Sequence, residues 1–143
     1  MSLLNAEDRW AITEILSLHG HLFDGGHLDR LDDIFAPGVV YDMSDLGMGI
    51  FEGIETIRRA ATQLGERNPL AHHVTNLVIT DDRGEAVTVR SKGLVIRADG
   101  TVGSVNHCDT LIRHDGQWRI SRRIITAQRA PWKLAEVTDA QQP

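Results

Sequence analysis

Two residues of this chain have the types and positions needed for acid–base chemistry. His72 lies in Leu70–Thr80, whose second half is β-branched and apolar and therefore typical of a strand. An imidazole with an unperturbed pKa of about 6.5 can act as a general base near neutral pH. Asp24 follows the segment Asn5–Phe23, which has helical periodicity, and a carboxylate at a helix C-terminus opposes the helix dipole. An aspartate can orient a histidine and stabilise its imidazolium, so we predict that Asp24 and His72 meet in one pocket.

Each candidate also has a purely structural interpretation. His72 could be a hydrogen-bonded core histidine, and Asp24 an exposed turn residue before Gly25-Gly26. His19 lies on the apolar face of the first helical segment and should point inward, as a core group or as part of a site. Arg123 could supply positive charge to a leaving group or an enolate oxygen, or it could lie on a solvated face. Further candidates for lining the cavity are Tyr41, His107, Phe23 and Phe51.

The alternation of a strand decides which side chains share a face. His72 and His73 should point in opposite directions, and His72 should share its face with Val74, Asn76 and Val78. Diverging histidines do not make a metal site, and no His-Glu-x-x-His or paired-cysteine motif is present. Dinucleotide, Walker and Gly-x-Ser-x-Gly patterns are also missing from the sequence. We therefore expect acid–base chemistry that needs no metal and no cofactor.

The elements that must position these residues are predicted to be helices first and strands last, which is an α+β order. Three acidic turns that contain glycine, at residues 82–84, 99–100 and 115–116, indicate an antiparallel meander with Leu70–Thr80 at its centre. We expect a long curved sheet to wrap around the first helix and leave an open pocket mouth. The predicted helices are Asn5–Phe23, His27–Phe35 and Ile54–Leu64; the strands are Val39–Met43, Leu70–Thr80, Ala86–Arg97, Val102–Arg113 and Gln117–Ala127, with a short piece at Ile50-Phe51.

Composition limits the class of protein. The chain has 143 residues, 41% of them hydrophobic, which is enough for one domain with a core, expected over residues 1–128 with a tail over 129–143. A net charge of -5 argues against binding to nucleic acid or to an anionic membrane, and no apolar run approaches a membrane span. The single Cys108 fits a reducing compartment, so a cytoplasmic location is expected. Because the helices cannot cover both sheet faces, we expect a homodimer or homotrimer.

The order and spacing of three segments resemble the SnoaL-like branch of the nuclear transport factor 2 (NTF2-like) superfamily. The similarity covers almost all of residues 5–128 and rests on Phe23-Asp24-Gly25, on His72-x-x-x-Asn76-Leu77 and on the run Arg113-His114-Asp115-Gly116-Gln117-Trp118-Arg119-Ile120. The resemblance implies a cone, in which a strongly bent and mostly antiparallel sheet encloses three N-terminal helices. It also implies a pocket at the wide end of the cone.

The nearest enzymes in that superfamily are scytalone dehydratase and hexachlorocyclohexane dehydrochlorinase, both cofactor-free lyases with a His–Asp pair. The resemblance implies that His72 and Asp24 form this pair here, and that His19 and Arg123 occupy the positions of a lysine and an arginine in the dehydrochlorinase. Phe23 stands where the dehydratase has a tyrosine. The chain therefore departs from each enzyme at one site position.

Two classes of function follow from these observations. The first is a lyase or isomerase that acts on a small apolar or cyclic substrate with His72 as the base, with a polyketide-cyclase-like or hydrolase reaction as a variant. The second is a non-catalytic module that carries an apolar ligand or assembles with other subunits. Because one fold hosts both classes, the site must decide between them.

Overall fold

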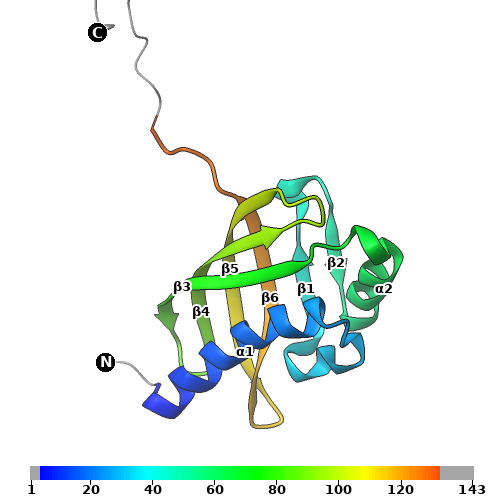
Figure 1. The fold of residues 1–143 in the computed structure, drawn as a ribbon. Coiled ribbons are helices and arrows are strands. Elements are labelled where there is room, and N and C mark those ends of the chain that lie inside the picture. Colours follow the sequence, from blue (N-terminus) through cyan, green and yellow to red (C-terminus); the bar gives the residue numbers. More distant parts are fainter. Residues whose placement is uncertain (1–3, 133–143) are drawn as a thin grey trace, which may run out of the picture.

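The fold is built on one six-stranded sheet whose inner face holds both α-helices (Figure 1). The structure is a computed structural model that describes residues 4–132. The helices are α1 (Ala6–Asp24) and α2 (Ile54–Leu64), with short 3₁₀ segments η1 (Leu28–Asp33), η2 (Ser44–Leu46) and η3 (Gly65–Arg67). The strands are β1 (Phe35–Asp42), β2 (Ile50–Glu52), β3 (Ala71–Asp82), β4 (Ala86–Ile96), β5 (Val102–His114) and β6 (Gln117–Ala127).

The sheet has the order β2-β1-β6-β5-β4-β3 and is curved and unclosed. All neighbouring pairs are antiparallel except β1 and β6, which run parallel. The predicted α+β class and the meander from β3 to β6 are therefore confirmed. The predicted central position of Leu70–Thr80 is wrong, because β6 pairs with β1 and leaves β3 as an edge strand at the opposite end of the meander.

The first helix begins with a capping box and is tied to the sheet at that end. The Asn5 side chain accepts a hydrogen bond from the Asp8 backbone N–H at 2.8 Å, and Asp8 accepts one from the Asn5 N–H at 3.2 Å. Asp8 also accepts hydrogen bonds from Arg113 on β5 and from Trp118 Nε1 on β6, at 2.7 and 3.2 Å. The start of α1 is thus fixed against the hairpin that closes the sheet. Its buried apolar face consists of Ile12, Leu16 and Leu22.

The closing hairpin has the shortest turn that a pair of strands can use. His114 pairs with Gln117, so only Asp115 and Gly116 form the loop. Both residues have positive φ, at 50° and 78°, as a type I′ turn requires. An Asp-Gly pair tolerates this conformation at low cost, which is why this turn can be predicted from sequence.

A bulge in β3 reverses the alternation that the sequence predicts. Asn76 has φ 56°, and the pairing with β4 shifts between Thr75 and Val78. The extra residue moves later side chains to the other face. Leu77 and Ile79 consequently pack on the core while Val78 is 57% exposed, so the prediction that Asn76 and Val78 share the face of His72 is wrong.

The region after α1 also differs from the prediction. The second predicted helix, His27–Phe35, is a 3₁₀ segment over Leu28–Asp33, and the next strand already begins at Phe35 rather than at Val39. Pro37 lies inside β1, where the pairing with β6 is irregular. A proline lacks the N–H that a regular ladder needs and is tolerated at such an irregularity.

The predicted tail over 129–143 lies largely outside the described residues. Gln128–Trp132 follow β6 without regular secondary structure. Across residues 4–132, no helix has the length and apolar character required to cross a membrane.

Gly20 permits the close packing of α1 on β3. A Cβ at this position would lie 2.4 Å from the His72 carbonyl oxygen, which is too short for any contact. We therefore expect Gly20→Ala to lower the free energy of unfolding by about 1–3 kcal/mol, as overpacking does. At an ordinary glycine in a helix, the same substitution would instead raise the free energy of unfolding by about 0.5–1 kcal/mol.

Urea unfolding of the wild type and of Gly20→Ala measures this difference in stability. Gly38→Ala is the matched control, because a Cβ at Gly38 meets nothing within 4 Å. A Gly20→Ala protein as stable as the wild type would contradict the close approach of α1 and β3.

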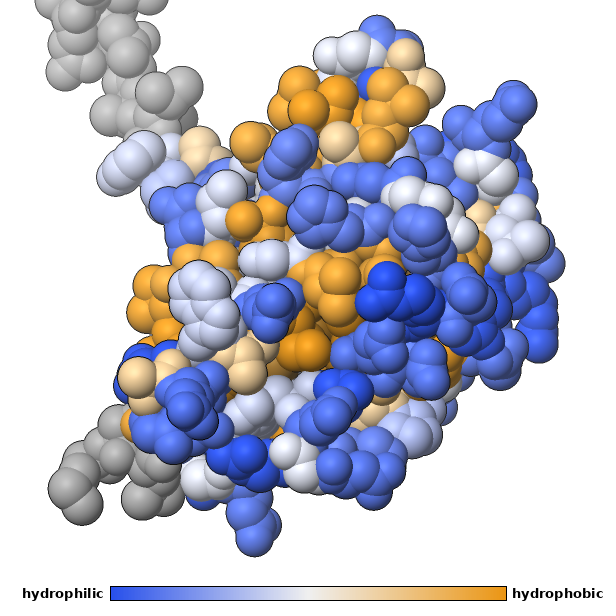
Figure 2. All heavy atoms as spheres, turned by 60° about the horizontal axis from the view of Figure 1, so that its bottom comes forward, coloured by the Kyte–Doolittle hydropathy of each residue, from blue (hydrophilic) through white to orange (hydrophobic). Residues whose placement is uncertain are grey.

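The outer face of the sheet has no helix over it in the described part of the chain (Figure 1). Val78 and Leu94 expose 57% and 41% of their surface on β3 and β4. Figure 2, in which the bottom of Figure 1 comes forward, shows exposed hydrophobic residues among hydrophilic ones on that side of the molecule too. We expect a homodimer or homotrimer that covers part of this face. Multi-angle light scattering at micromolar concentration should give two or three chains per particle, and a stable monomer would contradict the expectation.

Candidate active site

Asp24 and His72 meet at the point where α1 ends beside β3. Asp24 is the last residue of α1, and His72 is the second residue of β3. The Asp24 Oδ1 lies 2.6 Å from His72 Nδ1, and the His72 backbone N–H donates to Oδ2 at 2.9 Å. The carboxylate thus accepts hydrogen bonds from both the ring and the backbone of one residue. These contacts offset the unfavourable position of a negative charge at a helix C-terminus.

The contact fixes which ring nitrogen of His72 carries the hydrogen. A carboxylate can only accept, so Nδ1 carries the hydrogen and Nε2 is the nitrogen with a free lone pair. Within residues 4–132 no hydrogen-bond partner occupies Nε2. The side chains of His72 and Asp24 remain 24% and 26% exposed, so the pair is accessible from solvent. This is the geometry of an oriented general base.

His72 lines a cavity of about 460 Å³ between the inner sheet face and the two helices. Phe23, Tyr41, Phe51, His19 and His107 line it too, as the sequence predicts. Asp24 lies instead on a smaller cavity of about 290 Å³ that shares His72 and Phe23 with the first. The remaining wall is mainly apolar and includes Met43, Leu46, Met48, Ile57, Ala61, Leu64, Val74, Val95, Val105 and Ile125.

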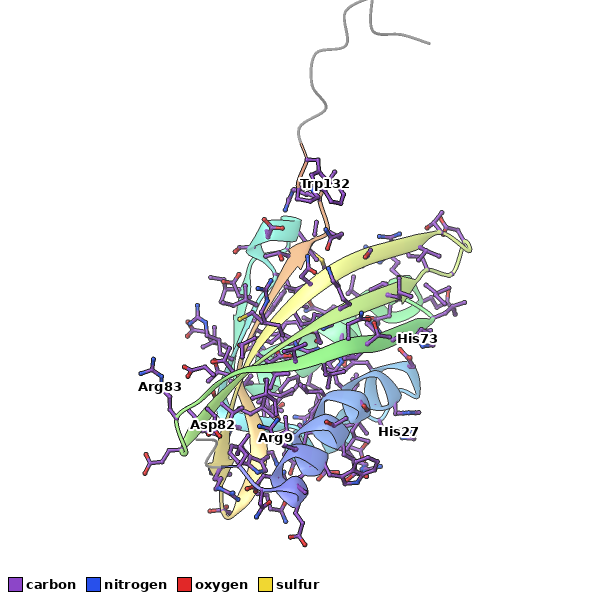
Figure 3. The ribbon with its side chains drawn as sticks, turned by 90° about the vertical axis from the view of Figure 1, so that its left-hand side faces the viewer. Arg9, His27, His73, Asp82, Arg83 and Trp132 are labelled. Atoms are coloured by element: carbon purple, nitrogen blue, oxygen red, sulfur yellow. The ribbon has the colours of Figure 1, made fainter. Side chains whose placement is uncertain are left out.

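The cavity reaches the end of β3 where the strand begins, at His72 and His73. Figure 3 shows His73 at this end of β3, near His27 beyond the end of α1, while Asp82 and Arg83 lie at the other end. His73 is exposed, although it contributes to the cavity lining. The predicted divergence of the two histidines therefore holds: His72 points to Asp24 and His73 to the surface.

His19 is a buried neutral imidazole next to the pair. Burial, followed by the nearby charge of Arg123, holds the pKa of His19 well below its usual value. Its Nε2 lies 3.1 Å from the Tyr41 hydroxyl, and its ring stacks on Phe23 with a centroid separation of 4.5 Å. The His19 and His72 ring centroids are 6.1 Å apart. His19 Nδ1 is buried and has no hydrogen-bond partner among the described residues.

Arg123 is not on the cavity wall, contrary to the prediction. Its side chain is fully buried and donates from Nε and Nη2 to the two carboxylate oxygens of Asp109, at 2.7 and 2.9 Å. Burial alone would lower the pKa of Arg123, but the charge and hydrogen bonds of Asp109 raise it overall. Tyr41 is its register partner on β1. The charge of Arg123 nevertheless affects groups that do line the cavity. After burial, it further lowers the pKa values of His19 and His107, and it partly offsets the rise that burial causes in the pKa of Tyr41.

The fourth imidazole of the cavity, His107, is held by Ser91. His107 Nδ1 lies 3.2 Å from the Ser91 hydroxyl. Burial, with a further contribution from Arg123, lowers the pKa of His107 to about 2. Gly93 provides the space, since a Cβ there would lie 2.7 Å from the His107 ring. His107 is thus a neutral polar group on an otherwise apolar wall.

The sequence analysis missed the partners of these buried groups. Asp109 and Ser91 could have been found from alternation, because each lies two residues from another inward side chain of its strand, His107 on β5 and Val89 on β4. Gly20 has no signal in the sequence that separates it from any other helical glycine. The part of the chain that the structure describes contains no group of three or more side chains that could hold a metal ion.

A curved, unclosed sheet around a long helix, with a His–Asp pair at the open end, defines the class to which this protein belongs. A SnoaL-like domain model matches residues 5–124, and the chain belongs to that family. The resemblance derived from the sequence is therefore confirmed. No curated protein sequence matches the chain.

Solved structures agree on the fold. A Novosphingobium aromaticivorans protein proposed to be a scytalone dehydratase is 20% identical with a TM-score of 0.71, over 90% of this chain and 89% of its own. A proposed aromatic ring hydroxylase from the same organism is 24% identical with a TM-score of 0.73, over 89% and 93%. A Mycobacterium tuberculosis protein of unknown function is 22% identical with a TM-score of 0.77, over 89% and 80%.

The buried neutral imidazoles should make the fold sensitive to acid. The pKa of His107 is about 2 in the fold against 6.5 for an ordinary histidine, so below pH 6.5 the unfolded chain binds a proton that the folded chain does not. Stability should therefore fall as the pH falls, by about 1.4 kcal/mol per pH unit for each such histidine. Urea unfolding at pH 7.5 and pH 5.5 measures the loss.

His107→Gln should reduce this loss, because glutamine does not titrate. His27→Gln removes an exposed histidine and serves as the control. Equal pH dependence in the wild type and His107→Gln would show that His107 is protonated in the folded protein.

Proposed function

We propose that this protein is a cytoplasmic, cofactor-independent lyase or isomerase in which His72 removes a proton from an activated carbon. The observation that supports this most directly is the 2.6 Å contact between His72 Nδ1 and Asp24, which leaves Nε2 as the basic nitrogen. The substrate is a small apolar or cyclic molecule held in the 460 Å³ cavity. This volume is within the usual range for small-molecule sites.

The reaction divides into proton removal and departure of a leaving group. His72 Nε2 takes the proton, and the electrons of the C–H bond move toward an adjacent carbonyl or form a double bond. In a dehydration the C–O bond then breaks, and the imidazolium returns its proton to the departing hydroxide, giving water. In an isomerisation the same proton returns to a different carbon. Asp24 stabilises the imidazolium in both cases.

Neutral hydrogen-bonding groups surround the reacting centre and could bind a developing oxyanion. Burial raises the pKa of the Tyr41 hydroxyl, although the charge of Arg123 partly offsets this effect, so Tyr41 stays protonated. His19 is neutral and has one free ring nitrogen. We assign to Tyr41 and His19 the role of hydrogen-bond partners for the substrate oxygen, with Arg123 contributing its field.

A non-catalytic ligand carrier is the second candidate function. The mainly apolar cavity wall favours it, because an apolar ligand would be bound without chemistry. It does not account for Asp24, whose carboxylate contacts the His72 ring at the end of a helix where a negative charge is unfavourable. The oriented imidazole therefore favours the enzyme. A cyclase-like or hydrolase reaction would use the same base on a different substrate.

Solvent deuterium exchange tests the proposed base without knowledge of the natural substrate. The probes are 2-tetralone, an apolar bicyclic ketone with acidic C–H groups, and a panel of cyclic β-hydroxy ketones in D₂O. The wild type should accelerate exchange next to the carbonyl, and His72→Ala should lower the rate by about two to four powers of ten. NMR spectroscopy follows the loss of the proton signal.

His21→Ala is the matched control, since it removes an exposed histidine that lines neither cavity. Its exchange rate and the urea midpoints of both variants should stay near those of the wild type. If His72→Ala exchanged the ketones at the wild-type rate, or lost stability before activity, His72 would be a structural residue and the carrier function would be favoured.

A further inference from the structure

The cavity has one permanently charged side chain on its wall. Among the described residues that line it, Arg97 is the only arginine or lysine, and there is no aspartate or glutamate. The rest of the wall is apolar or consists of neutral polar groups such as Asn68 and Ser104. A guanidinium beside an apolar cavity, with no acidic residue in the same wall, is suited to an anionic ligand group.

The chain makes room for the Arg97 side chain. Arg97 follows the end of β4, and its backbone N–H donates to the Thr101 carbonyl at 2.9 Å, which fixes the start of the turn to β5. The guanidinium lies across β5 at Gly103, where a Cβ would be 2.7 Å from Nη2. Gly103 does not have the positive φ that favours glycine in turns. The absence of a side chain at this position therefore serves the arginine rather than the backbone.

Most N–H donors of the Arg97 guanidinium have no hydrogen-bond partner among the described residues. Its one hydrogen bond is a long contact of 3.4 Å from Nη1 to the Thr101 hydroxyl, and no carboxylate in the described part of the chain forms an ion pair with it. The charge of Asp99, in the same turn, interacts with Arg97, but its hydrogen bonds go to the Thr101 N–H and hydroxyl, at 2.9 and 2.7 Å. Arginine has five N–H donors, so most of them are available to a ligand.

We propose that Arg97 binds a carboxylate, or a similar anionic group, of a ligand whose apolar part fills the cavity toward His72. The substrate class is then a small apolar acid, with its charged group at Arg97 and its reacting carbon at His72. The class of reaction rests on the proposed function, but the anion site does not, because binding needs neither His72 nor turnover.

A pair of probes of equal size isolates the charge. The probes are 2-naphthoate and its neutral amide, 2-naphthamide, titrated into the full chain at low ionic strength and followed by NMR chemical shifts. The wild type should bind the carboxylate about tenfold more tightly than the amide, the ratio expected for one charge-assisted hydrogen-bonding group. Arg97→Gln should bring the two dissociation constants together and leave the affinity for the amide unchanged.

Arg90→Gln is the matched control, because Arg90 is an exposed arginine on β4 that lies outside the cavity wall and its replacement changes the net charge equally. It should keep the tenfold preference. Gly103→Val, which fills the space under the guanidinium, should reduce the preference although Arg97 is still present.

The outcomes separate this inference from the proposed function. His72→Ala should retain the preference for naphthoate even though it loses deuterium exchange. If the wild type shows the preference for naphthoate but does not accelerate deuterium exchange, the anion site stands and the proposed enzyme fails. Equal affinity of the wild type for both probes, no binding of naphthoate, or an unchanged preference in Arg97→Gln would overturn the anion site, whatever the exchange assay shows.

Discussion

The backbone contact between α1 and β3 is the constraint on which the site depends. Gly20 brings the helix to the His72 carbonyl, and Asp24, four residues later, then reaches the His72 amide and ring. Because an α-helix advances about 5.4 Å in a turn, the carboxylate lies one turn beyond the contact and on the same side of the helix. A side chain at position 20 would separate the helix from the strand, and Asp24 from His72. The packing of α1 on β3 and the orientation of the His72 ring are therefore one interaction.

A second, fully buried interaction, between Arg123 and Asp109, helps to keep the buried imidazoles of the pocket neutral. Removing the Arg123 and Asp109 charges from water is costly, and two close hydrogen bonds between them offset that cost. Burial, and secondly the positive charge of Arg123, keep His19 and His107 neutral. These two polar groups on the inner wall therefore stay uncharged, whereas His72 is partly exposed and contacts the Asp24 carboxylate. This division of roles follows from burial rather than from residue type.

The sequence predicts local features of the fold well and long-range ones poorly. Helical periodicity locates α1 and α2, and Asp115-Gly116 predicts its hairpin, because neighbouring residues decide these features. The edge position of β3 depends on the pairing of β6 with β1, far apart in the chain, and no local pattern reports it. The Asn76 bulge shifts alternation only after His72, so the inward position of His72 was predicted correctly although that of Val78 was not. Arg123 was misplaced because its pairing with Asp109 follows a register shift between Thr110 and Leu111, which the Asp115-Gly116 turn does not predict.

The strands and α1 supply the histidines and the tyrosine of the cavity, and the link between β1 and β2 supplies flexible apolar side chains. His72, Asp24, His19 and Tyr41 come from strands and from α1, so the fold holds them in fixed relation. Met43, Leu46 and Met48 come from the link between β1 and β2, outside those strands, and Met48 is 46% exposed. Methionine is flexible and adapts to the shape of a ligand. The strand and helix residues can thus keep one base in place while changes in the link alter which molecule fits beside it. A single fold can in this way hold one acid–base arrangement and accept different substrates.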